Sequence, residues 1–141
     1  MHRHGLAASL LLLFASSALA GQIEDATFHS AALNAPLAVN IYRPDGAPPD
    51  NGWPVLYLLH GHDGNENSWC DLGNIEKTLD TLIAAGAIRP LVVVMPGVKN
   101  SWYVDSAAVG GPGDYETALT GDLRHQIEKT LPVRKDREGR A

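Results

Sequence analysis

The sequence predicts an α/β fold with a partly parallel sheet, and three features of the chain indicate it. Residues 55–59 and 91–95 are apolar runs, each followed by a glycine-containing turn, as is typical of strands buried on both faces of a sheet. Between them, residues 74–86 have a helical period. A strand, a helix and a second strand in this order predict a right-handed crossover between parallel strands.

The first twenty residues have the composition of an export signal. Arg3 precedes an apolar run over residues 6–14, and residues 18–20 (ALA) form a small-residue cleavage site. The run is shorter than the roughly 20 apolar residues that cross a bilayer. We therefore expect residues 1–20 to be removed. The mature chain would start near Gly21, lie in the periplasm or outside the cell, and remain free of the membrane.

The charge and cysteine content of residues 21–141 argue against two functions: binding of nucleic acid and catalysis by a cysteine. Ten basic side chains face sixteen acidic ones, a formal net charge of −6, because Arg3 is the only charged residue of the leader. This acidic balance argues against a nucleic-acid partner, which requires a basic patch. Cys70 is the only cysteine, so no disulfide can form within the chain. No histidine is placed to activate Cys70, and we expect a partly covered loop thiol.

The first strands are expected to form a hairpin. Residues 27–33 and 37–42 have strand-like patterns and would pair through a turn at residues 34–36. His29 would then lie on the surface of the first strand. Residues 45–52 are rich in glycine and proline and predict a loop before the buried strand over residues 54–59.

The helix after this strand has one apolar face, formed by residues at positions i, i+4, i+7 and i+8: Ile75, Leu79, Leu82 and Ile83. Gly86 is expected to end the helix in a left-handed conformation. The second buried strand, over residues 91–95, follows.

The C-terminal part predicts a long loop and a second helix. Residues 98–113 have no regular pattern, and loops of this length are often functional. Asp114 is expected to cap the helix, and His125 lies off its buried stripe, facing solvent. Residues 137–141 are expected to form a polar turn with nothing packed after it. The stripe repeats every fourth residue: Tyr115, Leu119, Leu123, Ile127 and Leu131.

This order of elements resembles the first half of an α/β-hydrolase, and more narrowly the esterase D-like family. That family includes S-formylglutathione hydrolases, feruloyl and other carbohydrate esterases, and mycolyltransferases. The resemblance covers roughly residues 28–141. It implies ester hydrolysis by a serine nucleophile, with no metal or organic cofactor. It rests on residues 58–64 (LLHGHDG), 92–96 (VVVMP) and 101–106 (SWYVDS), with further matches within 74–90 and 122–128.

The serine nucleophile of such enzymes is not found in this sequence. The family carries it in a G-x-S-x-G turn, followed along the chain by an acid and a histidine. None of the seven serines here lies in that pattern. By resemblance, the strand that leads to the nucleophile would begin at residues 139–141. We therefore expect an α/β-hydrolase fold truncated before the nucleophile-bearing strand. Residues 21–141 would be the N-terminal part of a single domain, inactive and poorly stable by itself.

One catalytic group is implied within the chain. By resemblance, the backbone N–H of His62, after Gly61, donates to the oxyanion of the reaction, and the His62 side chain is incidental. Trp102 and Tyr103 lie on the loop that borders the acyl pocket in relatives. They would either line the substrate site or pin the loop to the domain, and the sequence leaves both roles open. Gly61, in the turn before His62, is also expected to contact the substrate. The substrate would be a small-molecule or carbohydrate-linked ester.

Two other functions remain open at this point. His60, His62 and Asp63 follow a buried strand, a pattern similar to that of metal-dependent hydrolases. A zinc hydrolase needs at least three protein ligands, however, and neither His29 nor His125 is placed to complete the set. The other alternative is a non-catalytic exported α/β module.

Overall fold

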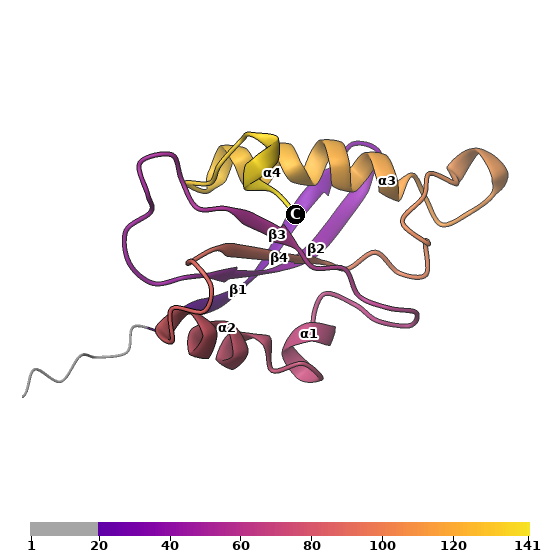
Figure 1. Cartoon of the computed structure of the whole chain (residues 1–141). Helices are drawn as coiled ribbons and strands as arrows, with labels where there is room; N and C mark the ends of the chain where they lie inside the picture. Colours follow the sequence, from indigo (N-terminus) through magenta and orange to yellow (C-terminus); the bar gives the residue numbers. More distant parts are fainter. Residues whose placement is uncertain (1–19) are drawn as a thin grey trace, which may run out of the picture.

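The computed structural model describes residues 20–141, so nearly all of the expected export signal lies outside the described part. The chain forms three layers, with a sheet between two layers of helices (Figure 1). No helix within residues 20–141 is both long and apolar enough to cross a membrane. The elements, in chain order, are β1 (Gln22–Ser30), β2 (Ala35–Arg43), β3 (Val55–Tyr57), α1 (Ser68–Asp71), α2 (Ile75–Ala84), β4 (Val92–Pro96), η1 (Ala107–Val109), α3 (Tyr115–Thr117), η2 (Ala118–Leu123), α4 (Arg124–Thr130) and η3 (Arg137–Gly139).

The sheet has four strands in the order β1-β2-β4-β3. β3 and β4 are parallel, with Val55 opposite Val92, whereas β2 pairs antiparallel with both β1 and β4. The predicted α/β class and the parallel strand–helix–strand unit are therefore confirmed. The helices α1 and α2 cover one face of the sheet, and α3 to α4 cover the other (Figure 1).

The β1–β2 hairpin differs from its predicted register. The turn lies at residues 31–34 rather than 34–36, and β1 starts at Gln22, five residues earlier than expected. Gln22 pairs with Arg43, so both strands are paired along their whole length. Asn34 closes the turn with a φ of 47°, a conformation that asparagine tolerates better than most residues.

The two buried strands differ in how well they are covered. All five residues of β4 are buried, because strands flank it on both sides and helices cover both faces of the sheet, whereas Leu91, also predicted to be buried, is only partly covered. In β3, only Val55 is fully buried, and Leu59 beyond its end is 40% exposed. In the described chain, only the last residues cover its outer edge. The Tyr57 N–H donates to the Ala141 carbonyl at 2.7 Å, and the Ala141 N–H donates to the Val55 carbonyl at 2.9 Å.

The expected polar turn at the end of the chain is followed by residues that pair with β3. Residues 137–141 contain a short 3₁₀ turn, after which Arg140 and Ala141 run parallel to β3. The Arg140 guanidinium anchors them, because its Nη1 donates to Glu128 Oε1 at 2.6 Å and to the Lys135 carbonyl at 2.7 Å.

The helix α2 follows its predicted pattern with one exception. Leu79 is buried and Ile75 and Ile83 are partly buried against the sheet, but Leu82 is 38% exposed. Gly86 follows the helix with a φ of 66°, which confirms the left-handed end. The short helix α1 was not predicted.

The second helix contains a π-helical turn that explains its four-residue spacing. In an ideal α-helix, side chains four residues apart differ by about 40° in direction around the helix axis. A stripe that repeats every fourth residue would therefore rotate away from the sheet. Over η2 the turn widens, and the Arg124 N–H donates to the Leu119 carbonyl five residues earlier. One residue is thereby absorbed without rotating the stripe, and Tyr115, Leu123 and Ile127 all remain buried.

Asp114 is the N-cap residue of the second helix, as expected, but its side chain makes no capping hydrogen bond. Its Oδ1 instead accepts a hydrogen bond from the Ala107 N–H at 2.9 Å. Asp105 takes its place from the preceding loop, accepting from both the N–H and the hydroxyl of Thr117. These bonds lower the pKa of the Asp105 carboxyl.

Candidate active site

The candidate site lies where the loops that follow β3 and β4 meet, at one end of the sheet (Figure 1). In α/β sheets, ligands bind at the carboxyl ends of the parallel strands. A cavity of about 170 Å³ lies here. Its lining comes from both loops: His60, Gly61, His62, Lys99, Asn100, Trp102 and Tyr103.

The loop after β3 is a tight turn that is bonded to the neighbouring loop. The Gly64 N–H donates to the Gly61 carbonyl at 3.1 Å, and Asp63 has a φ of 59°. Asn100 binds Asp63 twice: its Oδ1 accepts from the Asp63 N–H at 2.8 Å, and its Nδ2 donates to the Asp63 carboxylate at 2.7 Å. The turn is therefore held in one position relative to the loop after β4.

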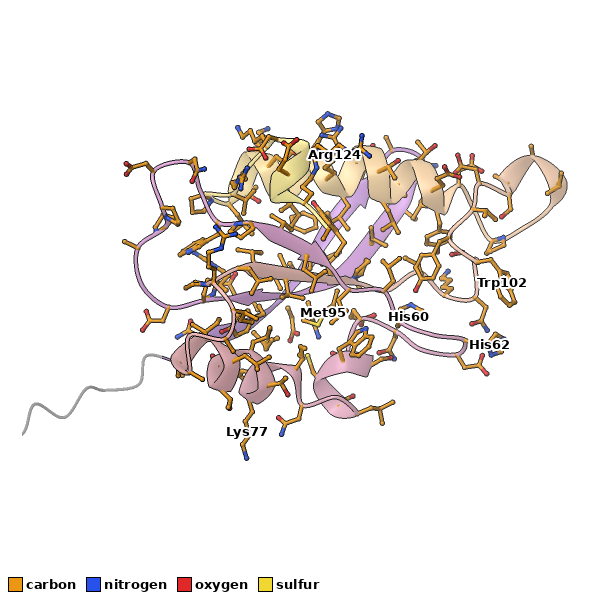
Figure 2. All side chains as sticks on the ribbon, viewed as in Figure 1. His60, His62, Lys77, Met95, Trp102 and Arg124 are labelled. Atoms are coloured by element: carbon orange, nitrogen blue, oxygen red, sulfur yellow. The ribbon has the colours of Figure 1, made fainter. Side chains whose placement is uncertain are left out.

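The backbone N–H of His62 is left without an acceptor. The N–H groups of Asp63 and Gly64, the next two residues, are both engaged, but within residues 20–141 none accepts from His62. The His62 ring points outward, where its Nδ1 lies 3.1 Å from the Asp63 carboxylate and both side chains are largely exposed (Figure 2). The turn thus presents a free donor at the edge of the cavity.

The His60 side chain connects the loop after β3 to the loop after β4. It is 6% exposed, and its Nε2 accepts a hydrogen bond from the buried Val98 N–H at 3.1 Å. Because Nε2 is an acceptor, Nδ1 carries the proton, which it donates to the Gly61 carbonyl at 2.7 Å. The Tyr103 hydroxyl donates to the His60 carbonyl. Sequence reasoning missed this structural role, since a histidine at the end of a strand carries no signal of its partners.

These bonds argue against the metal-dependent alternative. Both ring nitrogens of His60 are engaged with the backbone, so neither is free to bind a metal without losing its partner. His62 points to solvent, while His29 and His125 are exposed on β1 and α4, as predicted. Within the described part of the chain, no group of three or more His, Cys, Asp or Glu residues could hold a metal ion.

Trp102 and Tyr103 line the cavity from a constrained stretch of backbone. Both have positive φ values, 56° and 60°, which are uncommon for aromatic residues and costly in free energy. Tyr103 is partly buried and bonded to His60, so its contacts pin the loop while its ring also lines the cavity. Trp102 is 79% exposed, and its ring centroid lies 6.4 Å from that of His62 (Figure 2).

Cys70 lies outside this site, on α1 rather than on a loop. It is partly covered, as expected, and the Asn40 amide lies 3.8 Å from its sulfur. Burial raises the pKa of the Cys70 thiol, which disfavours the reactive thiolate.

Comparison with known proteins identifies the family. Residues 30–141 match the family described as "Putative esterase". The chain belongs to this esterase family. It is 33% identical over 127 residues to an endo-1,4-beta-xylanase/feruloyl esterase of Xylanibacter ruminicola, an alignment that covers 86% of this chain and 18% of that protein.

The solved structures of this esterase family have the same fold. A ferulic acid esterase superposes with a TM-score of 0.75 at 27% identity, over 87% of this chain and 49% of its own. A CE1 ferulic acid esterase of Anaeromyces mucronatus, in complex with ferulic acid, gives 0.71 at 19% identity, over 86% and 47%. The fold is therefore that of an α/β-hydrolase, as predicted. The chain spans about half of each of these structures and about a fifth of the xylanase/feruloyl esterase.

Proposed function

We propose that this chain is the N-terminal part of an exported serine carboxylesterase, in which the His62 N–H is one of two oxyanion donors. The observation that carries the proposal is the free His62 N–H at the edge of a cavity, on a turn held by Asn100. The second donor would be the N–H of the residue after the nucleophile. Neither that residue nor the nucleophile is among these 141 residues.

In the proposed reaction, the serine Oγ attacks the ester carbonyl carbon, and the histidine of the complete enzyme takes the hydroxyl proton and later gives it to the leaving alcohol. The carbonyl oxygen becomes an alkoxide. A fixed N–H directed at that oxygen stabilises the tetrahedral intermediate without reorganisation, which is worth about 10²–10³ in kcat. The alcohol leaves, and water then hydrolyses the acyl-enzyme. The constrained turn would keep the His62 donor in place through both steps.

A second cavity supports the proposal that further chain completes the domain. It has a volume of about 530 Å³ and lies beside Ala141, with Tyr57, Leu59 and Tyr103 in its wall. The Tyr57 hydroxyl is buried there without a hydrogen-bond partner in the described chain, and burial raises its pKa to about 12. A buried polar group left unpaired is unfavourable, and a segment that follows Ala141 along β3 would lie next to it.

We propose esters of hydroxycinnamic acids attached to carbohydrate as the substrate class. The support is the similarity to proteins described as feruloyl and ferulic acid esterases. Processing after Ala20 would release the protein into the periplasm or the medium, where polymeric carbohydrate is accessible.

The backbone donor can be tested in the complete enzyme with p-nitrophenyl acetate and methyl ferulate. His62→Ala keeps the N–H and should reduce kcat only modestly. His62→Pro removes the N–H and should lower kcat at least about 10²-fold. Circular dichroism must show that both variants are folded. Equal losses in folded variants would contradict the assignment.

The reaction class has a separate test. A fluorophosphonate probe should label the complete enzyme but not residues 1–141, because these lack the nucleophile. A complete protein that neither reacts with the probe nor hydrolyses esters would instead be the non-catalytic module.

A further inference from the structure

Asp80, on α2, holds the backbone nitrogen of Gly21 just before the first strand. The Gly21 N–H donates to Asp80 Oδ1 at 2.8 Å, and the Tyr42 hydroxyl donates to the same oxygen at 2.7 Å. Tyr42 is 1% exposed and belongs to the core beneath α2, and Asp80 is partly covered. This contact joins three parts of the fold: the start of β1, the end of β2 and the middle of α2.

The contact requires glycine at position 21. A Cβ there would lie 2.4 Å from the Tyr42 ring, so any larger residue would have to displace a buried aromatic side chain. Gly21 is buried, whereas the preceding Ala20 is exposed. β1 begins at the next residue, Gln22. The boundary between Ala20 and Gly21 therefore separates an exposed residue from one that is fitted into the domain.

The same boundary is the predicted export cleavage site, after residues 18–20. We infer that Asp80 and Tyr42 form a binding site for the α-ammonium group of Gly21, which cleavage after Ala20 creates. This inference rests on the proposed export of the chain. Cleavage converts a neutral peptide N–H with one proton into a cation with three donors, and the acceptor is already in place.

The charge of the site suits a cation. Burial, followed by the hydrogen bond to Asp80 and the negative charges of Asp80 and Glu76, raises the pKa of Tyr42, so the hydroxyl stays neutral. The carboxylates of Asp80 and Glu76, both on α2, thus act on Tyr42. In the described part of the chain, no cationic side chain forms an ion pair with Asp80. A charge-assisted hydrogen bond is roughly twice as strong as a neutral one, so cleavage should tighten the contact. Removal of the leader would then stabilise the mature fold.

A double-mutant cycle isolates this effect. The full chain is made in two forms: exported from cells and processed, or synthesised cell-free with residues 1–20 attached. Each form is made with Asp80 and with Asp80→Asn, which keeps an acceptor for both donors but removes the charge. Mass spectrometry first checks that the exported form begins at Gly21. Urea unfolding of all four proteins then gives the folding equilibrium constants.

Asp80→Asn should lower the folding equilibrium constant about tenfold more in the processed form than in the unprocessed form, which corresponds to one charge-assisted hydrogen bond. Glu76→Gln removes a carboxylate of the same helix that makes no bond to Gly21, so its effect should differ between the two forms by much less than that of Asp80→Asn. Equal effects of Asp80→Asn in the two forms would overturn the inference, as would a mature protein that begins at another residue.

A second measurement applies if either form unfolds too readily. An amine-acylating reagent at neutral pH should modify the Gly21 α-amine of the processed protein slowly and that of Asp80→Asn faster. Equal rates would count against the site. None of these measurements involves ester hydrolysis, so failure of the proposed enzymatic function would leave them unaffected.

Discussion

The role of His60 as a connector between the two active-site loops makes a quantitative prediction. His60→Leu keeps a side chain of similar size but removes the acceptor that the Val98 N–H has within residues 20–141, and Val98 is 0% exposed. An orphaned buried N–H costs about 1–3 kcal/mol. The Gly61 carbonyl also loses the ring donor, but it keeps the Gly64 N–H, and Gly61 is exposed so that water can replace the ring. We therefore expect a loss of about 1–3 kcal/mol in the free energy of unfolding.

Thermal unfolding followed by circular dichroism can measure this loss. For a domain of this size, about 1 kcal/mol lowers Tm by roughly 4 °C, so His60→Leu should lower Tm by about 4–12 °C. The matched control is His29→Leu on the exposed face of β1, which should change the unfolding free energy by about 0.5 kcal/mol or less.

Two further measurements separate the hydrogen bond from packing. His60→Gln offers an amide oxygen to the Val98 N–H and should recover part of the loss. In NMR hydrogen exchange, the Val98 amide should exchange faster in His60→Leu than in the unaltered chain. A loss in His60→Leu no larger than that in His29→Leu would refute the reasoning.

Three other changes have defined outcomes. Gly64→Ala puts a Cβ 2.8 Å from a ring nitrogen and should cost about 1–3 kcal/mol in urea unfolding, whereas Gly61→Ala meets no atom within 4 Å and should be close to neutral. The pKa of Asp122 is lowered, first by the Ala32 N–H in the β1–β2 turn and then by the hydroxyl of Ser30, the last residue of β1. Its stabilisation is therefore present above the unfolded pKa, about 3.9, and lost as pH falls through the folded value, so Asp122→Asn should flatten the acid limb of stability against pH. Arg140→Gln breaks the largely buried ion pair with Glu128 and should lower the free energy of unfolding by about 1–3 kcal/mol. Arg43→Gln breaks the exposed ion pair with Glu24 and should lower it by about 0–1 kcal/mol. Equal losses would contradict the anchoring role of Arg140.

Local patterns in the sequence were sufficient for much of the fold. The apolar run at residues 91–95 predicted the central strand β4, because a strand that is covered on both faces has apolar side chains on both. The stripe from Tyr115 to Leu131 predicted the second helix, and Gly86 marked the end of α2. These signals are local, since each depends on periodicity or on the conformational freedom of one residue.

The position of the candidate site was also predictable, because polar turns after parallel strands meet at one edge of the sheet. The contacts within it were not. Sequence alone gave no reason to expect that His60 would bind Val98, 38 residues away, or that Asn100 would hold Asp63. Such pairs become visible only when the two loops are brought together by the sheet.

The sequence by itself therefore determined the fold class, the family motifs and the missing nucleophile pattern. Tertiary structure alone decided which groups are free and which are engaged. It paired Ala141 with β3 and gave the first turn of the helix a side-chain partner in Asp105 rather than Asp114. It also left the His62 N–H without an acceptor among residues 20–141, while the N–H groups of Asp63 and Gly64 were bonded. The physical reason is that a hydrogen-bonding group is satisfied by whatever lies within about 3 Å of it, and long-range packing sets that neighbourhood.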